Sequence, residues 1–260
     1  MGLKIALFLF IAAAAFASEN FIIFAVDARK LDYSSASKLI RTIAKHPSDG
    51  SKNSDVGHAW IYLKQGSHML QGGHSAERGI IQPRYLEGVC LLAEEGDPNP
   101  ARYLLAEQSD GYFEIGDGGH RPTFAARIDL SADEAEKVRA FIEAYPFERY
   151  ALSEKSCATF VAEVAALVGL ELDYRQKIKL PRQLQGLPLW SDPVYSEITI
   201  ASPDRLEQSL RELVHSGRAA DATAWLIRQR SEPHLSRLKR SFGDLLLLPY
   251  RTWRWLQWVQ

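Results

Sequence analysis

The stretch SCATFVAEVAALVG, residues 156–169, predicts an α-helix that packs one side against the rest of the protein. Ser156 is of a type that often caps helix N-termini, and Gly169 can adopt the left-handed conformation that ends many helices. Between them, apolar residues recur at spacings of three and four: Phe160, Val161, Val164, Leu167 and Val168. Cys157 is therefore expected to be the first helical residue and to point toward the packed side.

Upstream of this helix, two short segments have the pattern of buried β-strands. Residues 21–26 form an apolar run rich in aromatic and β-branched side chains. Residues 58–64 alternate between two faces, with His58, Trp60 and Tyr62 on one and Ala59, Ile61 and Leu63 on the other. The other patterned segments are a helix within 34–46, a strand at 122–130, a helix from the Ser131–Glu134 capping box to Tyr145, and a strand at 198–200. This mixture predicts an α+β fold, with residues 170–191 irregular.

A second strand, over residues 68–73, is expected to pair with the first as a hairpin. The link is three residues long, 65–67, and contains a glycine. In this register His58 lies opposite His74, and the two histidines share one face of the sheet. A register shifted by one residue would place His74 on the other face.

The overall composition is that of a globular protein. Of the 260 residues, 46% are hydrophobic and 24% are charged, which excludes a collagen, a coiled coil and a disordered chain. The 31 basic and 32 acidic residues give a formal net charge of −1. A dedicated nucleic-acid binder needs a surplus of Lys and Arg for its phosphate contacts, so no nucleic-acid partner is expected.

The first seventeen residues have the pattern of a secretory signal peptide. Lys4 is followed by an apolar stretch at 5–16, and Ala15 and Ala17 are the small residues that a signal peptidase recognises. A membrane-crossing helix needs about twenty apolar residues, so a retained anchor is the weaker alternative. We expect removal of residues 1–17 and a secreted or periplasmic protein.

The rest of the chain is expected to form a mixed domain at residues 18–201 and a helical C-terminal appendage at 202–260. Ser202 and Pro203 start a helix, and the sequence beyond them is helix-like. The last eight residues contain three tryptophans: Trp253, Trp255 and Trp258. With the nearby leucines and arginines, they suit peripheral contact with a membrane interface. The alternative is that these aromatic residues pack back onto the domain.

Cys157 and two histidines form a candidate catalytic group. A thiol reacts as its thiolate, and the partial positive charge of a helix N-terminus lowers the pKa of a thiol there. A nearby imidazole takes the thiol proton, and His58 is the candidate for this base. His74 is the candidate for orienting His58. The backbone N–H of Cys157 and the hydroxyl of Tyr150 are candidate oxyanion donors.

Two motifs resemble the circularly permuted papain-like enzymes, a group that includes the lecithin:retinol acyltransferases and bacterial NlpC-type proteins. They are Gly57-His58-Ala59-Trp60 on a strand and, about a hundred residues later, Ser156-Cys157-Ala158-Thr159-Phe160-Val161 at a helix start. The resemblance covers roughly residues 50–170. It implies a small antiparallel sheet packed on the helix that carries Cys157, and hydrolysis or acyl transfer through a thioester on an amide or ester. The acyltransferases usually have Asn before the Cys and Glu-His after it, whereas this chain has Ser156 and Ala158-Thr159.

The compartment and the resemblance together imply a peptide or lipid of the cell envelope as substrate, with no cofactor. The alternative is a non-catalytic envelope binding or scaffold protein, in which Cys157 forms a disulfide with Cys90 or is a buried thiol.

His68 and His120 are candidates for contact with substrate, since His120 follows the glycine-rich turn at 116–119. A zinc site formed by His68, His74 and His120 is a further alternative. No pair of these histidines has the i, i+4 spacing of a zinc protease helix and no CxxC occurs, so no metal is expected.

Overall fold

The computed structural model of the chain describes residues 18–35, 38–39, 42, 56–76, 109, 111–179 and 197–230. Several sequence-based expectations lie outside these residues: the signal peptide at 1–17, Cys90, and the tryptophans Trp253, Trp255 and Trp258. Of the helix expected within 34–46, Lys38, Leu39 and Thr42 are described, and all three are helical. None of the helices in the described ranges is long and apolar enough to cross a membrane.

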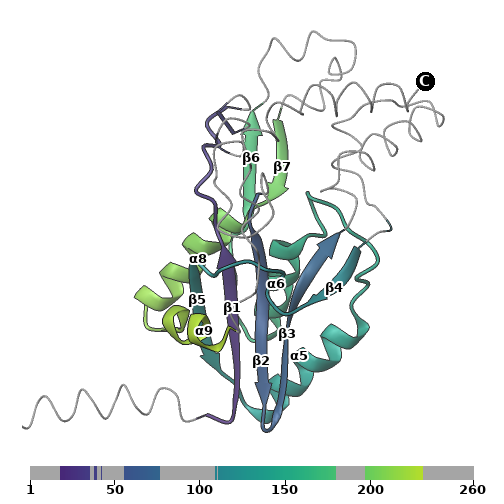
Figure 1. Cartoon of the computed structure of the whole chain (residues 1–260), viewed down its shortest axis with the longest axis vertical. Coiled ribbons are helices and arrows are strands. Elements are labelled where there is room, and N and C mark those ends of the chain that lie inside the picture. The colour runs from purple at the N-terminus through teal and green to yellow at the C-terminus, as the bar shows by residue number, and fades with distance from the viewer. Residues whose placement is uncertain are drawn as a thin grey trace, which may run out of the picture. The chain divides into compact units, whose positions relative to one another are not determined.

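The described residues form an antiparallel six-stranded sheet in the order β4-β3-β2-β1-β5-β8 (Figure 1). Its strands are β1 (Asn20–Asp27), β2 (His58–Gln65), β3 (His68–Ala76), β4 (Gly111–Ile115), β5 (Phe124–Asp129) and β8 (Ala220–Asp221). A separate two-stranded sheet pairs β6 (Arg175–Lys179) with β7 (Glu197–Ala201). The α+β class predicted from the sequence is confirmed.

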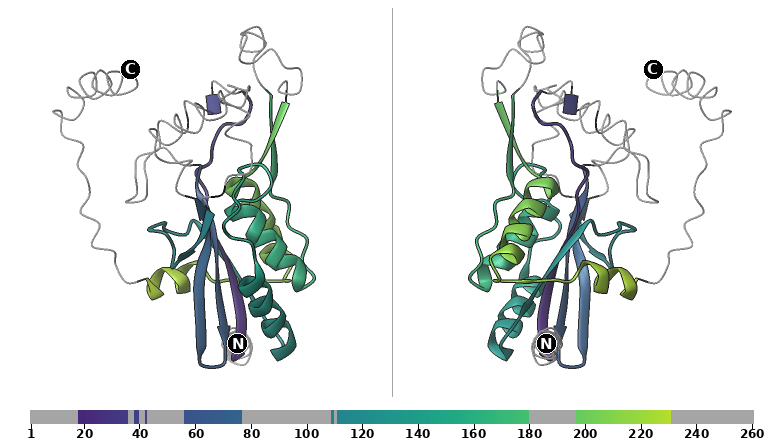
Figure 2. Two further views of the ribbon diagram at one scale, coloured as in Figure 1. Left: turned by 90° about the vertical axis from the view of Figure 1, so that its right-hand side faces the viewer. Right: turned by 90° about the vertical axis from the view of Figure 1, so that its left-hand side faces the viewer.

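Helices cover both faces of the large sheet (Figure 2). Three of them contribute to the larger hydrophobic core on one face: α5 (Ala132–Ala144), α6 (Cys157–Leu167) and α8 (Pro203–His215). The short α9 (Thr223–Gln229) covers the other face, where Leu226 is buried against the sheet.

Strand alternation divides the core into these two layers. In β1, Ile22, Phe24 and Val26 belong to the larger core, whereas Phe21, Ile23 and Ala25 belong to the smaller one. In β2 the larger core contains Ala59, Ile61 and Leu63, and the smaller one contains Trp60 and Tyr62. The alternation predicted for residues 58–64 is therefore confirmed, because a strand with covered faces buries both sets of its side chains.

The starts of α5 and α6 agree with the predictions from the sequence. Ser131 and Glu134 form the reciprocal bonds of a capping box at the start of α5, and the helix ends before Pro146. The α6 helix begins at Cys157 and is followed by Gly169 with a φ of 73°. Ser156 occupies the N-cap position of α6 without making a side-chain capping bond.

The predicted hairpin register is wrong by one residue. Gln65 pairs with His68, so the turn consists of Gly66 and Ser67 alone, and Ile61 pairs with Gly72. A two-residue turn with a φ of 57° at Gly66 has the local twist that suits a tight hairpin. The shift moves His74 to the face opposite that of His58, because side chains alternate along a strand.

Two further expectations about the second half of the chain are wrong. Residues 175–179 form strand β6 rather than irregular structure, because they pair with the predicted strand around 198–200. Residues 202–230 are no separate helical appendage. The leucines of α8 at 206, 210 and 213 lie in the larger core, and β8 pairs with β5.

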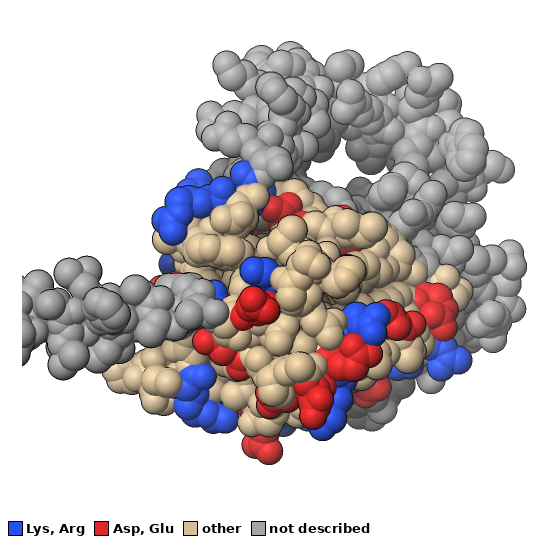
Figure 3. Space-filling model, turned by 90° about the horizontal axis from the view of Figure 1, so that it is seen from below, with Lys and Arg blue, Asp and Glu red and all other residues tan. Residues whose placement is uncertain are grey.

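Charged side chains of both signs are interspersed on the lower end of the molecule (Figure 3). On α5, for example, Arg139 lies 2.6 Å from a carboxylate oxygen of Glu136 and 3.3 Å from one of Glu143. Such exposed pairs contribute little to stability.

Candidate functional site

The candidate site lies at the end of the large sheet where β1 ends and β2 begins. Asp27 is the last residue of β1 and pairs in the ladder with His58, the first residue of β2. Gly57 precedes His58 with a φ of 94°, and a side chain there would overlap the backbone oxygen of Asp27. The glycine thus lets β2 start directly against the end of β1.

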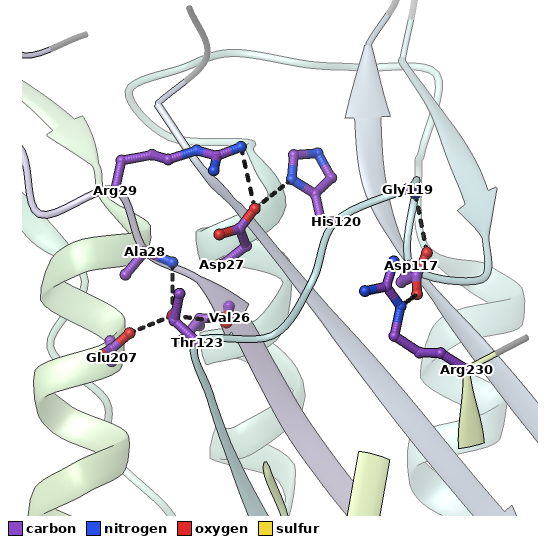
Figure 4. A network of polar contacts seen from close by, with 10 residues as sticks. All are labelled: Val26, Asp27, Ala28, Arg29, Asp117, Gly119, His120, Thr123, Glu207 and Arg230. Carbon is purple, nitrogen blue, oxygen red and sulfur yellow. Dashed lines mark hydrogen bonds and ion pairs between the residues drawn. The ribbon is translucent and has the colours of Figure 1, made fainter. Parts of the chain in front are cut away.

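A buried carboxylate organises this end of the sheet (Figure 4). Oδ2 of Asp27 lies 2.8 Å from Nδ1 of His120 and 3.2 Å from a guanidinium nitrogen of Arg29. None of the three residues is more than 6% exposed. A buried charge is costly unless it is paired, so the three side chains stabilise one another in this arrangement.

The hydrogen bond to Asp27 sets the chemistry of His120. An ionised carboxylate only accepts hydrogen bonds, so Nδ1 of His120 carries a hydrogen. The other ring nitrogen, Nε2, points away from Asp27 (Figure 4). This is the arrangement in which a carboxylate selects one tautomer of an imidazole and leaves its second nitrogen as a base.

The ring of His58 lies against two other rings. Its centroid is 4.8 Å from that of His120, with 30° between the planes, and 5.8 Å from that of Trp60, with 13° between the planes. On the side of β3, a Cβ placed on Gly73 would come within 3.0 Å of Nε2 of His58. The imidazole is therefore closely surrounded on the face of the sheet that carries Trp60.

His74 lies on the other face, inside an aromatic cage. Its ring makes edge contacts with Tyr145, Phe147 and Tyr150, and its Nε2 lies 3.0 Å from the backbone oxygen of Phe147. A carbonyl oxygen only accepts, so Nε2 donates and Nδ1 holds the lone pair. Burial lowers the pKa of His74 to about 4, which makes it neutral at ordinary pH.

His74 does not orient His58 in the way the sequence suggested. Within the described residues, Nδ1 of His74 is buried and makes no hydrogen bond, while Nε2 is bonded to Phe147. The expected hydrogen bond between His74 and His58 is therefore absent from the described structure. The physical reason is the shifted hairpin register, which places the two rings on opposite faces of the sheet.

Cys157 is the first residue of α6 and is 6% exposed. Its side chain belongs to the larger core, together with Ala59, the neighbour of His58 in β2. The loop that leads into α6 lies at the same end of the sheet, since the ring of Tyr150 is 5.0 Å from that of His74. Tyr150, the expected oxyanion donor, is thus placed beside His74.

The remaining candidate histidine lies elsewhere. His68 starts β3 next to the hairpin turn, where it is exposed, at the opposite end of the strand from His74. Among the described residues, no group of three or more His, Cys, Asp or Glu side chains has the arrangement of a metal site. The histidines of the alternative zinc site are distributed over three different places.

Sequence reasoning missed Asp27 and Arg29 as members of the site. A usable signal was present, since Asp27 directly follows the apolar run at 21–26 and therefore sits at the end of a buried strand. A charged residue in that position is either solvated at the sheet edge or paired in its interior. Which of the two applies depends on His120, 93 residues away, and on the loop that carries it.

No protein-family model matches this chain, and neither the curated proteins nor the solved structures contain a significant match.

Proposed function

We propose that the protein is a cysteine-dependent hydrolase or acyltransferase that forms a thioester at Cys157. The observations that carry this proposal are that Cys157, at the start of α6, shares the larger core with Ala59, the neighbour of His58 in β2, and that His58 lies beside the His120–Asp27 pair. Free N–H groups at a helix start favour a thiolate there, and Ser156 makes no side-chain capping bond that would compete for them.

In the proposed reaction, His58 accepts the proton of the Cys157 thiol. The thiolate attacks the carbonyl carbon of an amide or ester, and the backbone N–H of Cys157 donates to the oxyanion. The C–N or C–O bond then breaks, and the leaving group takes the proton from the His58 imidazolium. Water, or another acceptor, attacks the thioester and restores the thiol.

The strand alternation places one requirement on this mechanism. The ring of His58 lies on the face that carries Trp60, whereas Cys157 packs on the face that carries Ala59. Because His58 is the first residue of β2, proton transfer between the two must take place around this end of the strand.

The substrate is proposed to be a peptide or lipid of the cell envelope. This part of the proposal is supported by the signal-peptide pattern at residues 1–17 and by the resemblance of the two motifs to permuted papain-like enzymes. Export would also place Cys157 in an oxidising compartment, in which pairing with Cys90 is the competing fate of the thiol.

Alkylation of the native protein tests the role of Cys157. A Cys90→Ser background leaves a single thiol, and mass spectrometry then follows its reaction with iodoacetamide as a function of pH. We expect modification of Cys157 with an apparent pKa below the usual value of about 8.5. The His58→Asn variant should slow the reaction at pH 7 by roughly tenfold, because it removes the proton acceptor.

Two controls accompany this measurement. His68→Asn removes an exposed histidine at the far end of β3 and should leave the rate unchanged. Incubation with p-nitrophenyl acetate should produce an acetyl adduct that Cys157→Ser abolishes. A thiol that reacts only after unfolding would refute the enzyme and favour the scaffold alternative.

A further inference from the structure

We propose that His120 is a positioning residue for His58, and that its ring, held by Asp27, fixes the plane of the His58 imidazole. This inference deepens the proposed function and rests on it. It concerns which residues hold the base, a task that the sequence assigned to His74.

The first support is that His120 is itself fixed by its loop. Asp117, three residues earlier, accepts from the backbone N–H groups of Gly119 and His120 and forms an ion pair of 2.6 Å with Arg230 at the end of α9. Thr123, three residues later, accepts from the backbone N–H of Ala28 at 2.9 Å. Both ends of the segment are thus tied to other elements (Figure 4).

The second support is that the His120 side chain has one orientation available to it. Nδ1 donates to Asp27, and Asp27 is held in turn by its place at the end of β1 and by Arg29. A ring with a fixed backbone and a fixed Nδ1 cannot turn about its χ angles without losing a buried charge-assisted hydrogen bond. The orientation of the His120 ring is therefore fixed relative to Asp27 and β1.

The third support is the confinement of His58. His120 and Trp60 present their rings to it, and β3 lies close to Nε2 at Gly73. Of the two ring nitrogens of His58, Nδ1 is the one that is not directed at β3. In this arrangement His120 restricts rotation of the imidazole, so that the same nitrogen always faces the end of β2.

The charges around His58 are those of Asp27, Arg29 and His120. Two imidazolium rings at a centroid distance of 4.8 Å would repel each other, and Arg29 adds a further positive charge. The Asp27 carboxylate, which contacts Arg29, offsets the charge of that guanidinium.

A matched pair of variants separates the contribution of the His120 ring from that of its hydrogen bond to Asp27. His120→Phe keeps a ring that can stack on His58 but loses the donor to Asp27, whereas His120→Gln keeps a donor and loses the ring. His68→Gln serves as the control at an exposed site. Side-chain nitrogen NMR of the full chain reports the tautomer and ring order of His58, and alkylation reports the reactivity of Cys157.

We expect His120→Gln to mix the tautomers of His58, to broaden its ring signals and to slow alkylation at pH 7 by about tenfold. His120→Phe, which keeps a ring but loses the bond to Asp27, should broaden the His58 signals and slow alkylation less than His120→Gln does. Thermal unfolding of each variant verifies that it is folded.

The two readouts separate the failure of this inference from that of the proposed function. Unchanged His58 signals in His120→Gln would overturn the positioning role, even if Cys157 is reactive. An unreactive Cys157 in the parent protein, with His58 signals that still respond to His120→Gln, would overturn the enzyme and leave the positioning role intact.

Discussion

His58 and His74 lie on the neighbouring strands β2 and β3, but their surroundings differ in kind. His58 is stacked beside His120 and close to a carboxylate, whereas His74 is enclosed by aromatic rings and bonded to a backbone carbonyl. An imidazole in an apolar cage resists protonation. His74 should therefore make the free energy of unfolding depend on pH.

Lowering the pH should therefore reduce the stability of the folded protein, because His74 resists protonation in the folded state. Its folded-state pKa of about 4 lies below the ordinary value of 6.5, so the unfolded chain binds more protons between these values. The contribution of His74 to the free energy of unfolding is fully present above pH 6.5 and is lost as the pH falls toward 4. At pH 5 the loss relative to pH 7 is about 2 kcal/mol.

Urea unfolding at pH 7 and pH 5 measures this loss. His74→Gln can still donate to the Phe147 carbonyl but does not titrate, so it should remove that part of the pH dependence. His68→Gln, at an exposed position, should retain it. Equal pH dependence in the parent and in His74→Gln would contradict the assigned cause.

At the scale of single elements, the helices follow local sequence rules closely. The Ser131 hydroxyl accepts from the backbone N–H of Glu134 at 3.2 Å, and the Glu134 carboxylate accepts from the backbone N–H of Ser131 at 2.8 Å. These bonds also lower the pKa of Glu134, because they favour its charged form. Both partners lie within one turn, so the start of α5 needs no tertiary contact to define it.

Replacement of this cap should weaken α5 by a small, graded amount. Ser131→Ala removes the acceptor for the Glu134 N–H and is expected to lower the free energy of unfolding by about 1 kcal/mol. Ser131→Thr keeps the hydroxyl and should stay close to the parent in chemical denaturation. A loss in the threonine variant as large as that in the alanine variant would show that packing, rather than capping, sets the cost.

At the scale of the whole molecule, α8 belongs to the main core even though it follows the sheet in sequence. Leu206 and Leu210 are fully buried and Leu213 nearly so, and all three lie in the same cluster as Phe24 and Phe160. The start of α8 is joined to the first part of the chain as well. Its Asp204 carboxylate accepts from the backbone N–H groups of Lys30 and Leu31 at 2.8 and 2.7 Å.

Truncation of a core side chain in α8 tests this assignment. Leu210→Ala should lower the free energy of unfolding of the entire domain by about 2–5 kcal/mol, in a single cooperative transition. Leu167→Ala, at a partly exposed position of α6, should cost less. A separate early transition in Leu210→Ala would instead indicate that α8 unfolds as an independent unit.

Part of the site could be predicted from the sequence because it depends on neighbours in the chain. Cys157 at a helix start, with its side chain toward the core, follows from Ser156 and the apolar stripe up to Gly169. The alternation that separates His58 from Ala59 follows equally from the period of a strand. Such features involve contacts within about one helical turn or along one strand, so the local pattern contains the information.

The other part depends on distant segments and became known only from the tertiary structure. The one-residue change in register transferred His74 to the other face, and the loop at 117–123 placed His120 on Asp27. Strand β6 formed because a partner around residue 199 was present, and α8 joined the core because its leucines met β1 and β5. Local propensity does not distinguish these outcomes, since their free energies come from pairing and burial between segments far apart in the chain.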